Sequence, residues 1–104
     1  MANYVLLYKG GDVPATEEEQ QQVMAAWNGW YERLGQAVAD GGNPFGPAKS
    51  IAADGTVSDG GTSGLSGYTI LQADSLDAAT ELGQGCPILA SGSTVEVYEI
   101  FQVM

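Results

Sequence analysis

The segment "NYVLLY", Asn3 to Tyr8, restricts the possible folds of this chain more than any other stretch. Its aromatic, β-branched and leucine side chains, followed by two glycines, predict a buried β-strand. Large apolar residues occupy both sides of this strand, with Tyr4 and Leu6 on one side and Val5 and Leu7 on the other. We therefore expect a β-sheet that needs cover on both of its faces.

A long amphipathic helix is predicted after this strand. Thr16 and Glu19 have the spacing of a capping box, and three consecutive glutamates suit the positive end of a helix dipole. Apolar residues then recur at helical spacing: Val23, Trp27, Trp30, Tyr31, Leu34 and Val38. We expect Gly41 and Gly42 to end this helix and Gly35 to lie within it.

Two short strands joined by a tight turn are predicted in the middle of the chain. "AKSIAA", Ala48 to Ala53, and "TVSD", Thr56 to Asp59, flank Asp54 and Gly55, a pair typical of a two-residue primed turn. A glycine-rich run follows, and "GYTILQA", Gly67 to Ala73, is the next predicted strand.

A second helix and a last strand complete the pattern. Either Asp74 or Ser75 caps this helix, and Gly85 and Pro87 end it. The residues expected to face inward from it are Leu76, Ala79 and Leu82. "TVEVYEIFQV", Thr94 to Val103, predicts the final strand.

This order of elements predicts an α+β fold of the ferredoxin-like, split βαβ type. Such a domain has an antiparallel sheet with two helices on one face. The 104 residues suit a single domain that spans positions 1–104. Because the other face of the sheet would lie bare, we expect a homodimer packed sheet to sheet.

The charge and the composition exclude several function classes. Three basic residues stand against thirteen acidic ones, which gives a net charge of −10, so we expect no nucleic-acid and no membrane partner. The absence of histidine and the single cysteine, Cys86, leave no ligand set for zinc and no Ser-His-Asp or Cys-His nucleophile. We expect no metal and no cofactor. The single cysteine and the lack of a long apolar run indicate a cytoplasmic protein.

Several segments together resemble one protein family over essentially the whole chain. They are "NYVLLY", "ADGTVSDG", "GYTILQADSLDAATELGQGCP" and "STVEVYEIFQVM", which are similar to the YCII-related proteins of the branch named for its DGPF motif. The resemblance implies a dimeric α/β barrel of ferredoxin-like subunits, with a cleft between the sheet and the first helix. It also implies that Asp59, Gly60, Gly67 and Tyr68 match the motif. The His of the His-Asp pair ascribed to some members is absent, as are the Glu and Lys that follow the motif in the family.

Asp59 is the candidate catalytic residue. A carboxylate beside apolar strands can have a raised pKa and act as a general acid or base. The alternative is that Asp59 accepts backbone N–H bonds and stabilises its own turn. The glycine-rich run after it lacks the lysine and the following helix of a phosphate-binding loop, so it is better read as a flexible connection over a cleft.

Candidate ligand-binding residues are Tyr68, Trp30, Arg33 and Gly60. The aromatic residues Trp27, Trp30 and Tyr31 could line a pocket for a flat apolar ligand, or could simply pack in the core. Arg33, the only arginine, could hold a ligand carboxylate, or could remain on the surface.

Three functions therefore remain open for this chain. The first is a small dimeric protein that binds an organic ligand in a cleft between the sheet and the first helix. The second is an enzyme without a cofactor that uses Asp59 as general acid or base on a small carbonyl or aromatic substrate. The third is a non-catalytic dimeric interaction module.

Overall fold

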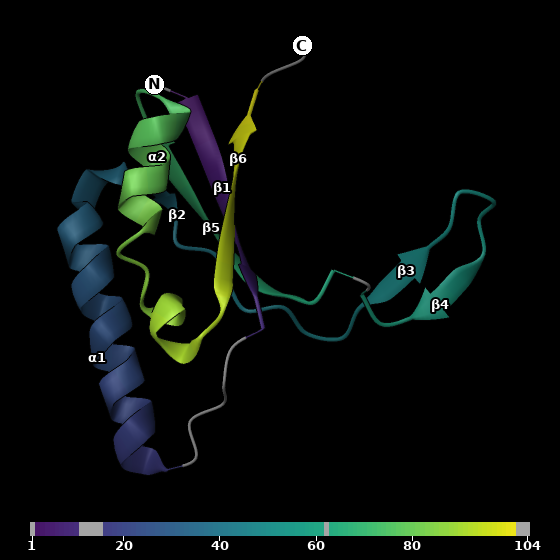
Figure 1. Cartoon of the computed structure of the whole chain (residues 1–104), viewed down its shortest axis with the longest axis horizontal. Coiled ribbons are helices and arrows are strands. Elements are labelled where there is room, and N and C mark those ends of the chain that lie inside the picture. The colour runs from purple at the N-terminus through teal and green to yellow at the C-terminus, as the bar shows by residue number, and fades with distance from the viewer. Residues whose placement is uncertain (1, 11–15, 62, 102–104) are drawn as a thin grey trace.

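The computed structural model describes residues 2–10, 16–61 and 63–101, and its centre is an antiparallel sheet of four strands. The strand order is β2-β5-β1-β6, with β1 at Ala2–Lys9, β2 at Val38–Asp40, β5 at Leu65–Ala73 and β6 at Thr94–Ile100. The helices α1, Glu17–Leu34, and α2, Leu76–Gly83, both cover one face of this sheet (Figure 1). The expected α+β, ferredoxin-like arrangement is thereby confirmed.

The helix α1 begins where the sequence predicts and ends earlier. The Thr16 side chain accepts the backbone N–H of Glu19 at 3.1 Å, as the capping box requires. The helix stops at Leu34, because Gly35 takes a positive φ of +54° and starts a short 3-10 turn, Gly35–Ala37. The expectation that Gly35 and Val38 belong to the helix is wrong: Val38 pairs with Leu71 in the sheet.

The predicted hairpin exists, but its turn has a different form. β3, Lys49–Ile51, pairs with β4, Val57–Asp59. The Gly55 N–H donates to the Ala52 carbonyl, and Gly55 alone has a positive φ, +91°. A type I′ turn needs a positive φ at both central residues. Since Asp54 lacks one, the two-residue primed turn is wrong, and the five residues from Ala52 to Thr56 connect the strands.

The second helix is shorter than predicted. Ser75 is its cap, since the Ser75 side chain accepts the Ala78 N–H at 3.0 Å. Ala79 is fully buried, whereas Leu76 is 46% exposed, which corrects its expected inward position. The helix ends at Gly83, and a 3-10 helix, η2 at Pro87–Ser91, leads to β6. The strand was expected to reach Val103, a residue that lies outside the described ones.

The main core lies between the sheet and the helices. Tyr4, Leu6 and Tyr8 alternate along β1 as buried residues, while Val5 and Leu7 are half-buried on the opposite face. The buried residues of the larger cluster are Leu6, Tyr8, Trp30, Leu34, Leu71 and Cys86. The sheet face without helices is called the open face below.

Candidate functional site

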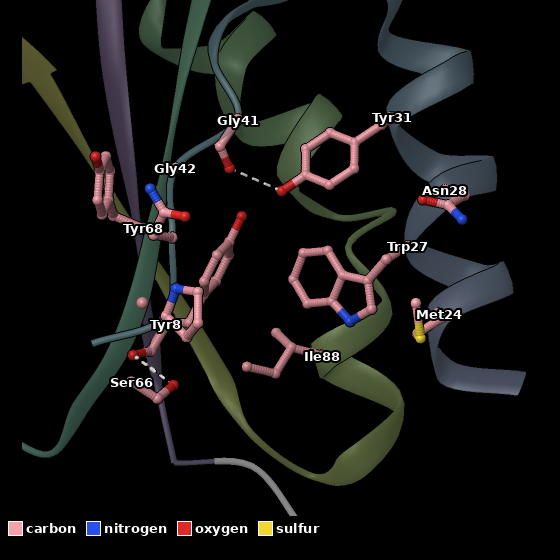
Figure 2. A pocket seen from close by; sticks show the side chains of 13 residues that line it. Tyr8, Met24, Trp27, Asn28, Tyr31, Gly41, Gly42, Ser66, Tyr68 and Ile88 are labelled. Atoms are coloured by element: carbon pink, nitrogen blue, oxygen red, sulfur yellow. Dashed lines mark hydrogen bonds between the residues drawn. The ribbon is translucent and has the colours of Figure 1, made fainter. Parts of the chain in front are cut away.

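A cavity of about 640 Å³ lies between α1 and the end of the sheet where β1 finishes and β5 starts. This volume is in the range of small-molecule sites. α1 contributes Met24, Trp27, Asn28 and Tyr31, and the sheet contributes Tyr8, Ser66, Gly67 and Tyr68. The connection between β2 and β3 contributes Gly41 to Pro44, and η2 contributes Ile88. Figure 2 shows the side chains of Tyr8, Trp27 and Tyr31 facing one space from β1 and α1, with Ile88 of η2 beside them.

Aromatic rings form one wall of this cavity. The centroids of the Tyr8 and Trp27 rings lie 5.4 Å apart, with 75° between the ring planes. Trp27 also meets Trp30 at 5.6 Å and Tyr31 at 6.0 Å. The edge-to-face contacts of Trp27 with Tyr8 and Trp30 hold these rings in fixed orientations. The half-buried Trp27 therefore offers a rigid apolar surface to a flat molecule.

A network of hydroxyl groups lies beside the rings. The Tyr8 hydroxyl donates to Thr69 Oγ1 at 2.5 Å, and Thr69 Oγ1 donates to the Gly41 carbonyl at 3.1 Å. The Tyr31 hydroxyl donates to the same carbonyl at 2.9 Å and lies 3.2 Å from Thr69 Oγ1. Each hydroxyl has one proton, so all three protons are used within the network. The Tyr31 oxygen retains lone pairs that can accept a hydrogen bond from a ligand.

Glycines shape the opposite wall of the cavity. Gly42 has a φ of +74°, and a Cβ placed there would lie 1.7 Å from the Tyr68 carbonyl oxygen. Only glycine permits this close approach of the connection to β5. A Cβ at Gly67 would likewise lie 3.2 Å from the Asn43 carbonyl oxygen. The chain from Asn43 to Phe45 can therefore lie along β5, where the Phe45 N–H donates to the Ser66 carbonyl at 2.9 Å.

Among the described residues that line the cavity there is no Asp, Glu, Lys or Arg. Burial is the main cause that raises the pKa of the Tyr8 hydroxyl, which keeps this residue protonated over the ordinary pH range. Burial likewise raises the pKa of the Cys86 thiol, which lies in the core beside Tyr8. The site is thus apolar and uncharged, with hydroxyl and carbonyl groups at one end.

The structure places Asp59 and Gly60 away from this cavity. Both lie at the base of the β3–β4 hairpin, and the Asp59 side chain is 94% exposed. The Asp59 carboxylate forms an ion pair with Lys49, with 2.8 Å between Asp59 Oδ1 and Lys49 Nζ. This partner differs from the backbone N–H groups of its own turn, which were the alternative partners expected for Asp59. The role of Asp59 as general acid or base stays a prediction, and neither residue borders the cavity.

The other three candidate residues have separate positions. Trp30 is only 1% exposed, and its indole N–H donates to the Leu82 carbonyl at 3.1 Å, so it packs in the core behind Trp27. Arg33 is exposed in the last turn of α1 and does not border the cavity. Tyr68 borders the cavity, while its ring lies on the other side of β5 (Figure 2).

Sequence reasoning identified Trp27, Tyr31 and Tyr68 as possible pocket residues and did not single out Tyr8 or Gly42. Tyr8 was assigned to a buried strand, and nothing in its neighbourhood marks it as the residue at the strand's cavity end. Gly42 was assigned to a helix end, although a pair of glycines before Asn43 and Pro44 is equally typical of a connection that must pass close to another backbone.

Residues 2–10, 16–61 and 63–101 contain no group of three or more Cys, Asp or Glu side chains arranged to hold a metal ion. Within these same ranges, neither helix is long and apolar enough to cross a membrane.

Comparison with known proteins identifies relatives of this fold. The family model described as YCII-related domain matches residues 2–104. No curated protein sequence matches the chain significantly. A similar solved structure is the 5-chloro-2-hydroxyhydroquinone dehydrochlorinase TftG from Burkholderia phenoliruptrix AC1100, in complex with 2,5-dihydroxybenzoquinone. The two share 19% identity and a TM-score of 0.55, over 94% of this chain and 93% of TftG. At this identity the likeness shows the fold.

Proposed function

This chain belongs to the YCII-related domain family, and from that premise we propose that it binds a small neutral aromatic compound carrying a hydroxyl group. The observation that carries the proposal is the cavity of about 640 Å³ with aromatic walls and no acidic or basic side chain among its described lining residues. Apolar cavities with a few convergent polar groups are the usual form of small-molecule sites. The complex of TftG with 2,5-dihydroxybenzoquinone supports a hydroxylated ring as the ligand, while the choice of a neutral ring rests on the cavity itself.

Charge favours a neutral ligand. The chain carries a net charge of −10, which repels anions at a distance. Inside the cavity no described lysine or arginine is present to pair with a carboxylate, so an anionic ligand would lose its hydration without compensation. A neutral ring carries no such cost.

The hydroxyl network favours a hydrogen-bond donor on the ring. Because the protons of Tyr8, Thr69 and Tyr31 are all donated within the network, this network offers a ligand only lone pairs. A phenolic hydroxyl can donate to the Tyr31 oxygen while its ring lies against Trp27. We therefore assign recognition of the ring to Trp27 and recognition of its hydroxyl to Tyr31.

A matched pair of ligands tests this proposal by isothermal titration calorimetry. 2-Naphthol is neutral near pH 7, whereas 2-naphthoate has the same ring system and a negative charge. For a compound with so few atoms we expect a Kd on the order of 0.1 mM for 2-naphthol. We expect 2-naphthoate to bind at least about tenfold more weakly, since it has no cationic partner in the site. Equal or tighter binding of 2-naphthoate would overturn the assignment of a neutral ligand.

Two alanine variants locate the binding. Trp27→Ala removes the half-buried ring of the cavity wall and should weaken 2-naphthol binding about tenfold or more. Phe45→Ala removes another partly exposed aromatic side chain, which lies outside the cavity, and should leave the affinity unchanged. Equal losses in the two variants would show that the ligand does not use this cavity.

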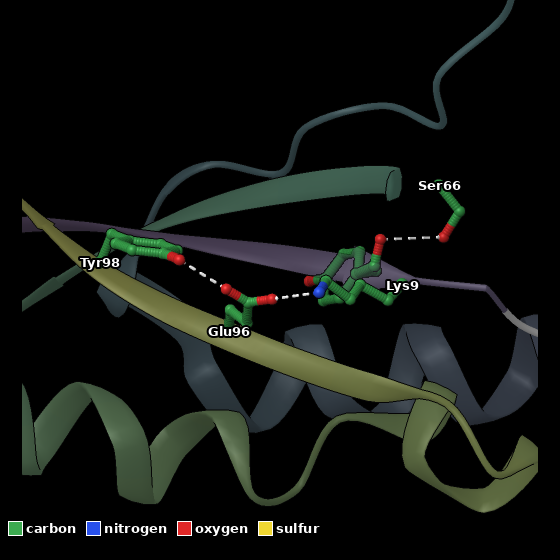
Figure 3. Close-up of polar contacts among 5 residues, drawn as sticks. Lys9, Ser66, Glu96 and Tyr98 are labelled. Atoms are coloured by element: carbon green, nitrogen blue, oxygen red, sulfur yellow. Dashed lines mark hydrogen bonds and ion pairs between the residues drawn. The ribbon is translucent and has the colours of Figure 1, made fainter. Parts of the chain in front are cut away.

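We further propose that the protein acts as a homodimer packed through the open face. The strand register places Val5, Leu7, Ile70 and Tyr98 on this face, and all are half-buried or exposed in the single chain. On β1, β5 and β6 the charged side chains of this face are Lys9 and Glu96, which pair at 2.7 Å (Figure 3). The three strands therefore present a face with an apolar centre and no net charge, although the chain as a whole is strongly acidic.

Sedimentation equilibrium tests the dimer. We expect the wild-type protein to have twice the 10.8 kDa mass of one chain. Leu7→Glu puts a carboxylate at the centre of the open face and should raise the dimer dissociation constant at least about a hundredfold, because like charges that face each other cost several kcal/mol. Gln21→Glu, which adds the same charge at an exposed position of α1, should not change it. A wild-type protein that remains monomeric contradicts the dimer.

A further inference from the structure

The β3–β4 hairpin, residues 48–60 and called the arm here, projects away from the rest of the molecule. It extends on the side of the sheet that carries no helices (Figure 1). Its effect on the overall shape is measurable: the radius of gyration is 15.2 Å, against about 13 Å for a compact domain of this length. The arm is thus a separate two-stranded sheet beside the open face.

One surface of the arm is apolar and exposed. Ile51 and Val57 are direct cross-strand neighbours, and they are 73% and 55% exposed. An isolated two-stranded hairpin is marginally stable in water and needs a further packing surface. Apart from pairing with each other, β3 and β4 do not pack substantially against any other element of the described chain.

The arm is continuous with the open face at its base. Phe45 precedes the arm, and its ring stacks on Tyr68 with 5.7 Å between centroids and 19° between planes. Tyr68 pairs with Leu7 in the sheet register, so its ring belongs to the open face. A partner molecule that covers the open face would therefore also contact the arm.

The charges on the arm and on the open face indicate which kind of molecule can cover both surfaces. On the apolar side of the arm the charged neighbours are Lys49 and Asp59, which neutralise each other at 2.8 Å. The strands of the open face also carry no net charge. A second copy of this acidic chain can thus approach both surfaces with little electrostatic repulsion.

We propose that the arm clasps a second copy of this chain, with Ile51 and Val57 packed against the partner subunit. This inference rests on the homodimer proposed above and adds a second contact to it. The sheet-to-sheet contact covers the open face, and the arm of each chain then lies along the flank of the other. The arm obtains in this way the packing surface that it lacks in the single chain.

A double variant measures the contribution of the arm. Replacing Ile51 and Val57 together with serine removes the apolar pair and should raise the dimer dissociation constant about tenfold or more by sedimentation equilibrium. Val23 on α1 and Leu76 on α2 are exposed apolar residues on the helix side of the molecule, and replacing both with serine is the matched control, with no expected change. Equal dissociation constants for the wild type and the arm variant would overturn the clasp.

A mixed-dimer experiment locates the arm. The Ser58→Cys protein carries a spin label at position 58 and no ¹⁵N. It is mixed with ¹⁵N-labelled wild-type protein, and the broadening of the wild-type amide signals is recorded. We expect broadening on the partner from Ser58→Cys and little from Gln21→Cys on α1. A dimer without broadening from Ser58→Cys would overturn the clasp and leave the dimer standing. A monomer in the sedimentation measurement would overturn both, while the binding of 2-naphthol is measured independently of either.

Discussion

Replacing Gly42 with alanine is expected to lower the free energy of unfolding by about 2 to 4 kcal/mol. The backbone at Gly42 has a φ of +74°, and the new Cβ would meet the Tyr68 carbonyl oxygen at 1.7 Å. Because that obstacle is backbone of a central strand, it cannot move aside as a flexible side chain would. Urea unfolding followed by circular dichroism measures the loss.

Gly41→Ala is the matched control for this prediction. Gly41 is the preceding residue, has no positive φ, and has open space where its Cβ would lie. We expect this variant to unfold within about 1 kcal/mol of the wild type. Similar stability of the two variants would mean that the connection does not lie against β5 as described, and the cavity wall would have to be redrawn.

The second large effect is expected for Trp30→Ala, which should cost about 3 to 5 kcal/mol of stability. Trp30 is one of the largest fully buried side chains, and its removal also leaves the Leu82 carbonyl without the indole donor. Thermal or urea unfolding measures this change. In the Trp30→Ala molecules that remain folded, Trp27 should keep its position at the cavity wall.

Trp27→Ala separates packing from binding. Because Trp27 is half-buried at the cavity wall, we expect a smaller loss of stability than for Trp30→Ala together with the larger loss of ligand affinity. The reverse result, with Trp30→Ala stable and unable to bind 2-naphthol, would return the ligand-binding role to Trp30.

The sequence predicted the fold because its local signals agree with its packing. The capping residues Thr16 and Ser75 both lie at the helix starts, and the alternation along β1 distinguishes the helix side of the sheet from the open face. The end of α1 was missed for a physical reason. Val38 follows Leu34 by four residues, which fits a helix, and only its pairing with Leu71 across the sheet places it in a strand.

The sequence did not indicate which candidate residues border the cavity, because proximity along the chain does not imply proximity in the fold. Asp59 and Tyr68 are nine positions apart in sequence, yet the arm carries Asp59 away from β5. Trp27 and Trp30 share one apolar face of α1, and helical periodicity does not tell which ring reaches the core and which borders a cavity.

The most direct test of the central claim, that the cavity between α1 and the sheet binds a neutral hydroxylated ring, is a titration with 2-naphthol followed by ¹H–¹⁵N NMR. Binding in this cavity should shift the Trp27 indole signal and the backbone amides of Gly41, Gly42 and Gly67, which line it. The amides of Asp59 and Gly60 on the arm should remain unchanged. Shifts confined to Asp59 and Gly60, or no shifts at saturating ligand, would contradict the account.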